Sequence, residues 1–334
     1  MTVPPFRAVQ YGVGPIGAEI AALAIERGIE IVGAIDIDPE LVGRDLASVL
    51  EIEQPTDVPI TDDPGEALAT DPDVVFHATG SVLADVAPQL QTCLAHGVTV
   101  VSTTEELSYP WRTNEKVASE LDAIAREHDA GLLGTGINPG FAMDLLPTVL
   151  SLPCRRVDSI SVCRLQDAGT RREPLQRKIG CGMSAERFDR EVRTTGGHVG
   201  LEESIAMLAT GLGWELTQVD TTIDPVLADD PVASDVIEVG SGEVAGIAQE
   251  GVGFVEDEPK IRFDLEMTIG ATDPHDEVAI DGIPSVTVRT VDGFHGDVTT
   301  PALIVNAAPA AVSADPGLHT VLDLPPGTWR AGSA

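Results

Sequence analysis

Residues Phe6–Asp36 read FRAVQYGVGPIGAEIAALAIERGIEIVGAID, and this stretch decides the fold. Apolar runs predict buried strands over residues 6–11 and 31–35, and helical spacing of apolar residues predicts a helix over 18–27. A glycine-rich turn separates the first strand from the helix, and an acid follows the second strand. The order of strand, glycine turn, helix, strand and acid is typical of a dinucleotide-binding βαβ unit.

The spacing of glycines in the turn has a physical reason. Gly12 allows a tight turn, Gly14 lets a pyrophosphate approach the backbone, and Gly17 lets the helix pack closely on the strand. The helix N-terminus favours phosphate. The alternative is that the glycines serve only the turn itself. We expect the cofactor to contact Gly12, Gly14, Pro15, Ile16 and Gly17.

The acid after the second strand bears on the choice of cofactor. Asp36 should accept hydrogen bonds from the adenosine ribose and repel a 2′-phosphate, which favours NAD. Arg44 could swing in and partly offset that repulsion. We therefore expect NAD or NADP, with NAD preferred or both used.

Length and composition predict a soluble, cytoplasmic protein. The chain has 334 residues, enough for two domains, and 43% of them are hydrophobic. No apolar run approaches the length of a membrane span, and no signal peptide is expected. The cysteines form no C-x-x-C pair and no metal-ligand spacing with histidine, so no metal is expected.

The net charge is unusually negative. It is −34, and lysine occurs only at Lys116, Lys178 and Lys260. Self-repulsion of this kind weakens a compact state, and concentrated salt screens it. The composition resembles that of halophilic cytoplasmic proteins. No basic stripe is visible, which argues against nucleic-acid binding.

Two domains are expected. Strands and helices alternate up to residue 134, which predicts a doubly wound parallel sheet of the Rossmann type in a domain over 1–145. Strand-like runs then dominate, with helices over 142–150, 184–193 and 201–212, which predicts an α+β domain over 146–297 on an open mixed sheet. This domain should bind substrate and form a dimer. Residues 300–312 are small and apolar and predict a helix, and a C-terminal helical segment of about 298–330 is expected to pack back on the first domain.

Several blocks of the sequence resemble one family. They are VSTTEELSYP at 101–110, GINPGF at 136–141, RREPLQRKIG at 171–180 and GHVGL at 197–201. The chain resembles 2,4-diaminopentanoate dehydrogenase and the native amine dehydrogenases, nearly end to end. The resemblance implies a homodimer that carries out NAD(P)-dependent oxidative deamination of an amine or diamino acid, reversible as reductive amination of ketones. In the same fold group, 4-hydroxy-tetrahydrodipicolinate reductase has a paired-histidine motif that is absent here.

Three loops should meet at the nicotinamide, because they follow the later strands of the sheet. They are residues 79–81, 103–107 and 135–141. From them we expect cofactor contacts at Thr79, Gly80, Ser81 and Asn138, and a substrate contact at Phe141. The alternatives are an ordinary strand-end turn for the first loop and a rigid hinge for the third.

Further substrate contacts are expected from the second domain. His198 lies in a glycine-rich loop over 194–200. Arg171 and Arg177 belong to a cationic cluster with Lys178 and could bind a carboxylate. A structural hydrogen bond for His198, and salt bridges for the arginines, are the alternatives.

Adjacent glutamates after the fifth strand are the expected catalytic groups. Positive charge develops on the iminium when hydride leaves a carbon that bears an amine, so a carboxylate would stabilise that state and accept a proton. We expect Glu105 to play this part and Glu106 to face solvent or a structural partner. Other readings are a dinucleotide-binding redox sensor without turnover, and a hydroxy-acid or semialdehyde dehydrogenase.

Overall fold

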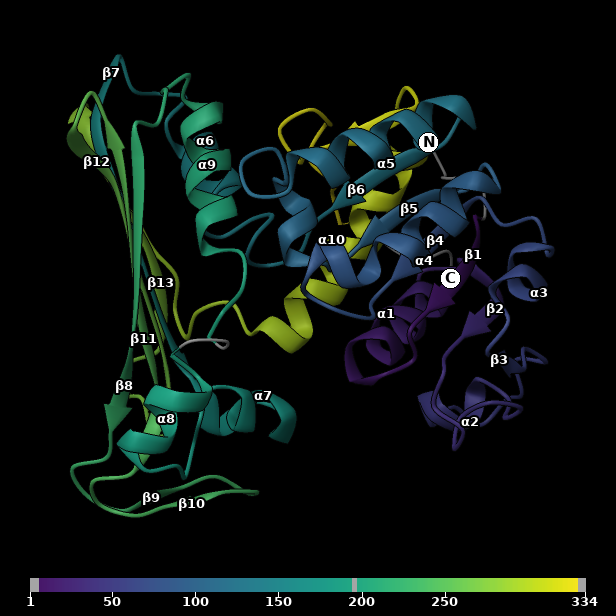
Figure 1. Cartoon of the computed structure of the whole chain (residues 1–334), viewed down its shortest axis with the longest axis horizontal. Helices are drawn as coiled ribbons and strands as arrows, with labels where there is room; N and C mark the ends of the chain where they lie inside the picture. The colour runs from purple at the N-terminus through teal and green to yellow at the C-terminus, as the bar shows by residue number, and fades with distance from the viewer. Residues whose placement is uncertain (1–5, 194–196, 330–334) are drawn as a thin grey trace. The chain divides into compact units, whose positions relative to one another are not determined.

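The computed structural model describes residues 6–193 and 197–329. Two compact units divide it: Phe141–His295 form the second unit, and the chain on either side of them forms the first. Each unit has its own sheet (Figure 1).

The first unit is built on a parallel sheet of seven strands in the order β15-β6-β5-β4-β1-β2-β3. The strand order reverses between β1 and β4, which is the switch point where ligands bind in sheets of this type. The strands are β1 (Arg7–Tyr11), β2 (Glu30–Ile35), β3 (Ile60–Thr61), β4 (Val74–His77), β5 (Thr99–Ser102), β6 (Gly131–Gly134) and β15 (Gly317–His319). The predicted Rossmann topology is confirmed.

Helices cover both faces of this sheet (Figure 1). They are α1 (Pro15–Glu26), α2 (Ala47–Leu50), α3 (Pro64–Leu68), α4 (Leu83–Ala95), α5 (Glu115–Glu127) and α10 (Gly296–Val312), with the short 3-10 helix η1 (Glu105–Ser108). On one face Ile20 of α1 and Ile304 of α10 share a core, and on the other Leu90 of α4 packs with Leu121 of α5. Helix α1 begins three residues before the predicted 18–27 because Pro15 suits the first helical turn.

The helix predicted over 300–312 is confirmed as part of α10, whereas the helical segment predicted over about 298–330 is wrong in its extent. Helix α10 ends at Val312, and strand β15 then adds to the sheet beside β6. The sequence Asp315-Pro316-Gly317 explains this, because proline cannot continue the helix and Gly317 has φ of +139°. Leu318 is buried at the new sheet edge, and its N–H donates to Asp122 Oδ1 at 2.8 Å.

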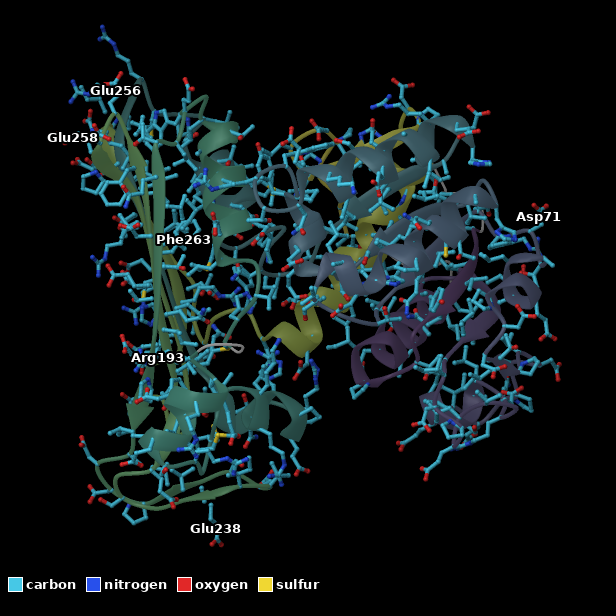
Figure 2. All side chains as sticks on the ribbon, in the orientation of Figure 1. Asp71, Arg193, Glu238, Glu256, Glu258 and Phe263 are labelled. Carbon is cyan, nitrogen blue, oxygen red and sulfur yellow. The ribbon has the colours of Figure 1, made fainter. Side chains whose placement is uncertain are left out.

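The second unit is built on a six-stranded mixed sheet in the order β14-β13-β7-β12-β11-β8. Strands β7 and β12 are parallel and the other neighbours are antiparallel, which confirms the predicted mixed sheet. The strands are β7 (Arg156–Asp167), β8 (Gln218–Leu227), β11 (Val244–Val255), β12 (Glu258–Thr268), β13 (His275–Ile283) and β14 (Val286–Arg289), with β9 (Val232–Ala233) and β10 (Glu238–Val239) paired separately. Phe263 of β12 is fully buried and anchors the sheet (Figure 2).

The helices of the second unit lie in two groups. They are α6 (Leu145–Leu150), α7 (Glu173–Lys178), α8 (Ala185–Glu191) and α9 (Leu201–Gly211). Figure 1 shows α6 with α9 near one end of the sheet, and α7 with α8 near the other. Asp144 joins the first pair, because its carboxylate accepts the Leu145 N–H at 2.7 Å and the Ser204 hydroxyl at 2.8 Å. This cap starts α6 later than the predicted 142–150.

Strand β13 and helix α7 were not predicted. The segment HDEVAIDGI of β13 mixes acids with apolar residues, and Asp276 is buried there only because it pairs with Arg164 of β7. Helix α7 is short, polar and largely exposed, so it carries little apolar periodicity.

The acidic side chains lie largely on the surface. Asp71, Glu238, Glu256 and Glu258 are exposed on turns or strand ends and point outward (Figure 2). Among the described residues, no helix is long and apolar enough to span a membrane.

Candidate active site

The glycine turn after β1 has the shape of a phosphate cradle. Gly12 has φ of +85°, and a Cβ there would lie 2.5 Å from the Ala78 carbonyl oxygen. A Cβ at Gly17 would lie 1.8 Å from the Gly12 oxygen, so only glycine fits at both positions. At Gly14 a Cβ would meet nothing within 4 Å, so the approach to its backbone is open. The residues present therefore fit a pyrophosphate at the N-terminus of α1, where Pro15 and Ile16 begin the helix.

Asp36 is tied to this turn. Its Oδ2 accepts the Val13 N–H at 2.7 Å, and its Oδ1 accepts the Asp38 N–H at 2.9 Å. Each carboxylate oxygen keeps a further lone pair for a ribose hydroxyl. Arg44 is exposed, and its guanidinium donates to the Ser48 carbonyl at 3.4 Å.

The loops after β4 and β5 are joined by hydrogen bonds. The Thr104 hydroxyl donates to the Gly80 carbonyl at 2.9 Å, and the Glu106 N–H donates to the Ser81 carbonyl at 3.3 Å. Thr79 and Gly80 are exposed. The structure thus brings the predicted cofactor loop next to the segment that carries both glutamates.

The two glutamates have different surroundings. Glu106 Oε2 accepts the Leu83 N–H at 2.7 Å at the start of α4, and it accepts the Asn114 side-chain amide at 3.3 Å. Its carboxylate therefore caps a helix N-terminus, where negative charge is favourable. Glu105 is half-buried at the first position of η1.

Residues 135–140 of the third loop, after β6, are buried. Its backbone begins with a bond from the Thr135 N–H to the Ser102 carbonyl at 2.9 Å, and the Ile137 N–H donates to the Thr300 hydroxyl at 3.3 Å. Asn138 is 6% exposed, and the Asn138–Pro139 peptide bond is cis.

A buried histidine at the end of β4 was missed in the sequence. His77 is 0% exposed, and its ring lies edge-on to Tyr11 at 5.4 Å. Its Nδ1 lies 2.9 Å from Ser102 Oγ and its Nε2 lies 2.9 Å from Gln89 Oε1. Burial lowers the pKa of His77 to about 4, so the ring is neutral. The one available signal was a histidine at the last position of an apolar strand, directly before the predicted cofactor loop.

In the second unit, Arg171 belongs to a group of buried or half-buried charges. Arg164 is buried, its Nε lies 2.6 Å from Asp276 Oδ1, and its Nη2 donates to the Phe294 carbonyl at 3.1 Å. Burial is the main cause that lowers the pKa of Arg164, and the positive charge of Arg171 acts in the same direction. Arg171 therefore lies near a second guanidinium.

The other predicted substrate residues of this unit have separate settings. Phe141 packs edge-on against Phe294, with ring centroids 5.6 Å apart. Arg177 is exposed and donates to Glu173 Oε1 at 2.7 Å, which is the salt-bridge alternative weighed for it.

The backbone of His198 is held by one side chain. Its N–H donates to Gln249 Oε1 at 2.6 Å, and its carbonyl accepts from Gln249 Nε2 at 3.3 Å. Of the predicted loop over 194–200, residues 194–196 lie outside the described residues.

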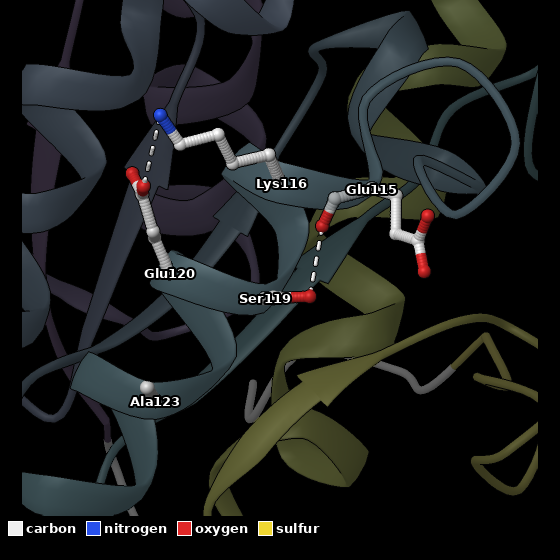
Figure 3. Close-up of a pocket in the computed structure, with 5 residues that line it drawn as sticks. All are labelled: Glu115, Lys116, Ser119, Glu120 and Ala123. Carbon is white, nitrogen blue, oxygen red and sulfur yellow. Dashed lines mark hydrogen bonds and ion pairs between the residues drawn. The ribbon is translucent and has the colours of Figure 1, made fainter.

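A surface hollow of about 530 Å³ lies on helix α5 (Figure 3). Its lining comes only from the exposed side of that helix, where Lys116 Nζ lies 3.8 Å from Glu120 Oε1 and the Ser119 hydroxyl donates to the Glu115 carbonyl at 2.8 Å. These five lining residues do not bring reactive groups together. Within residues 6–193 and 197–329, no cluster of His, Cys, Asp and Glu could hold a metal ion.

Sequence families match both parts of the chain. Residues 8–126 match the family described as dihydrodipicolinate reductase, N-terminus. Residues 141–332 match the family described as 2,4-diaminopentanoate dehydrogenase C-terminal domain.

Individual relatives match over nearly the whole length. The 2,4-diaminopentanoate dehydrogenase of Acetoanaerobium sticklandii is 30% identical over 329 residues, which cover 96% of this chain and 93% of that protein. An amine dehydrogenase of Streptomyces virginiae is 28% identical, covering 97% of this chain and 98% of that protein. The solved structure of an amine dehydrogenase from Mycobacterium smegmatis superposes with a TM-score of 0.89 at 27% identity, covering 99% of both chains.

Proposed function

Because this chain belongs to the 2,4-diaminopentanoate dehydrogenase family, we propose that it catalyses the NAD(P)-dependent oxidative deamination of a small-molecule amine or diamino acid, with reductive amination of a ketone as the reverse reaction. The observation that carries the proposal, beside the family match, is a pair of adjacent carboxylates directly after β5. Glu106 caps helix α4, and Glu105 is half-buried at the first position of η1.

The first unit supplies the residues that would hold the dinucleotide. The turn at Gly12, Gly14 and Gly17 would take the pyrophosphate, and Asp36, which accepts the Val13 N–H, would accept hydrogen bonds from the ribose. We assign Thr79, Gly80, Ser81 and Asn138 to the nicotinamide end. When bound, the nicotinamide would supply the acceptor for the hydride that leaves the substrate carbon.

Glu105 performs the protein's part of the chemistry. Its carboxylate holds the substrate ammonium, accepts a proton from it, and stabilises the positive charge that develops on the nitrogen as the iminium forms. The segment over 101–110 contains two glutamates and no lysine, arginine or histidine. A cation there would oppose the same charge, which is why a carboxylate suits amine rather than alcohol oxidation.

NAD is the proposed preference. The Asp36 carboxylate puts negative charge where a 2′-phosphate would lie, and Arg44 is occupied by the Ser48 carbonyl. In the second unit we propose substrate contacts at Phe141, Arg171 and His198. Arg177 is a weaker candidate, because it donates to Glu173. For a diamino acid, the Arg171 guanidinium would bind the carboxylate.

A substrate screen in concentrated KCl tests the proposal. Amines, diamino acids and matched 2-hydroxy acids are offered with NAD⁺ or NADP⁺, and ketones with ammonia and NAD(P)H. The proposal requires turnover of an amine, and ammonia-dependent oxidation of NAD(P)H in reverse. Turnover of hydroxy acids alone would favour a hydroxy-acid dehydrogenase, and dinucleotide binding without any turnover would favour a sensor.

A further inference from the structure

The end of strand β4 carries a polar network whose central members, His77, Ser102 and Thr104, are fully buried. His77 has polar partners at both ring nitrogens, because Gln89 of α4 lies 2.9 Å from Nε2 and Ser102 of β5 lies 2.9 Å from Nδ1. His77 and Ser102 are register partners in the parallel pair β4–β5. The pairing of the two strands therefore places these side chains together.

The network continues from Ser102 into the next loop. Ser102 Oγ lies 3.0 Å from Thr104 Oγ1 and accepts the Thr104 N–H at 3.1 Å. The Thr104 hydroxyl donates to the Gly80 carbonyl at 2.9 Å. The network thus runs from His77 at the end of β4, through Ser102 and Thr104 after β5, to the backbone of the loop that follows β4.

The network also closes on itself. The Thr79 hydroxyl donates to Gln89 Oε1 at 2.6 Å and lies 3.0 Å from His77 Nε2. Thr79 and Gly80 are consecutive, so both ends of the network hold the same loop. The end that holds Gly80 is Thr104, which is the residue directly before Glu105.

We infer that His77 is a positioning residue that, through Ser102 and Thr104, fixes the loop Thr79–Ser81 relative to Glu105. This inference rests on the proposed function, since it gives the loop to the nicotinamide and Glu105 to the amine. A displacement of about 1 Å between a reacting group and its partner can lower a rate by about a hundredfold, so a rigid link at this place has a catalytic purpose.

Burial of a polar network is otherwise unfavourable. His77, Ser102 and Thr104 are fully buried and lose their hydration, so the site must supply hydrogen bonds in return, whereas apolar side chains would fill the space without that requirement. The choice of histidine also keeps the network uncharged, since burial lowers its pKa to about 4. A lysine or arginine in its place would put positive charge near the developing iminium.

The first test needs no substrate. Thr104→Val removes the hydroxyl with little change of volume, and Thr104→Ser keeps the hydroxyl. Hydrogen exchange is followed in peptides over residues 79–83 and 103–108, with residues 30–35 of β2 as an internal control. We expect Thr104→Val to speed exchange at 79–83 by about fivefold or more, while Thr104→Ser stays close to wild type. Unchanged exchange at 79–83 in Thr104→Val overturns the inference.

The second test uses turnover and NADH affinity. Thr104→Val should lower kcat by about tenfold and change the affinity for NADH, measured by fluorescence, by less than about threefold. In the Glu105→Gln background, Thr104→Val should lower kcat by less than about threefold. The carboxylate is already absent there, so its misplacement can no longer slow the reaction. An undiminished tenfold loss in that background contradicts a role through Glu105. Ser102→Ala serves as the second variant if Thr104→Val does not fold, with the same expectations.

The two proposals fail separately. A wild-type enzyme that does not oxidise amines, but shows the loosening of residues 79–83 in Thr104→Val, would refute the proposed function and keep the link between the loops. Amine turnover with no difference between Thr104→Val and Thr104→Ser in either test would refute the link alone.

Discussion

The backbone N–H of Leu83 donates to Oε2 of Glu106 at 2.7 Å, so the second of two adjacent glutamates caps helix α4. The same oxygen accepts from the side chain of Asn114, which precedes α5. Glu106 therefore joins the starts of two helices.

Removal of this cap should reduce stability. We expect Glu106→Ala to lower the free energy of unfolding by about 1 kcal/mol, the usual cost of a lost N-cap. Glu106→Gln keeps an acceptor oxygen and should cost less. Denaturant unfolding in constant KCl measures both. An unchanged unfolding midpoint in Glu106→Ala would contradict the capping role.

Cofactor preference should follow Asp36. Wild type should show higher kcat/KM with NAD⁺ than with NADP⁺. Asp36→Asn should narrow that ratio by about tenfold, since one charge-assisted hydrogen bond to the ribose and one repulsion are lost. Initial rates with both cofactors measure the ratio, and Arg44→Ala serves as the matched control. A strong preference of the wild type for NADP(H) would contradict the role of Asp36 in favouring NAD.

Salt should stabilise the protein. With a net charge of −34, counter-ions relieve repulsion within the chain and between protomers of the proposed homodimer. We expect Tm to rise from dilute buffer to molar KCl, and light scattering to report a dimer that dissociates in dilute buffer. Sucrose at equal osmolality is the control for effects other than screening. A Tm that is independent of salt would contradict this prediction.

The buried histidine should make stability depend on pH. The pKa of His77 is lowered to about 4 by burial, whereas an unfolded histidine has about 6.5. Between these values the unfolded chain binds the proton and the folded chain does not, so stability falls as pH falls from about 6.5 toward 4, by up to about 3 kcal/mol. His77→Asn should lack this part of the slope, measured as unfolding free energy from pH 7 to pH 5. Equal slopes in both proteins would contradict it.

Local pattern accounts for what the sequence could predict. The strand, glycine turn and helix around Gly12 lie within one continuous stretch, and their chemistry depends on near neighbours. The parallel sheet and the mixed second sheet could be predicted from such stretches in series. Asp36 and the pair Glu105–Glu106 could be proposed for the same reason.

Contacts between distant segments account for what was missed. Asp276 gives β13 a polar sequence. Its burial depends on the ion pair with Arg164 of β7, which the local sequence does not reveal. His77 acquires its partners from β5 and α4, which register and helix packing bring together. Strand β15 was missed because its three residues form a strand only by pairing with β6, and apolar content alone did not reveal that pairing.

The most direct test of the central claim is the kcat of Glu105→Gln, with Glu106→Gln as the matched control and NADH affinity as the check on folding. The account predicts that Glu105→Gln binds NADH like wild type and loses about a hundredfold or more in kcat, the scale of a positioned acid or base. Glu106→Gln should lose much less. If Glu105→Gln keeps wild-type turnover, the carboxylate mechanism is wrong.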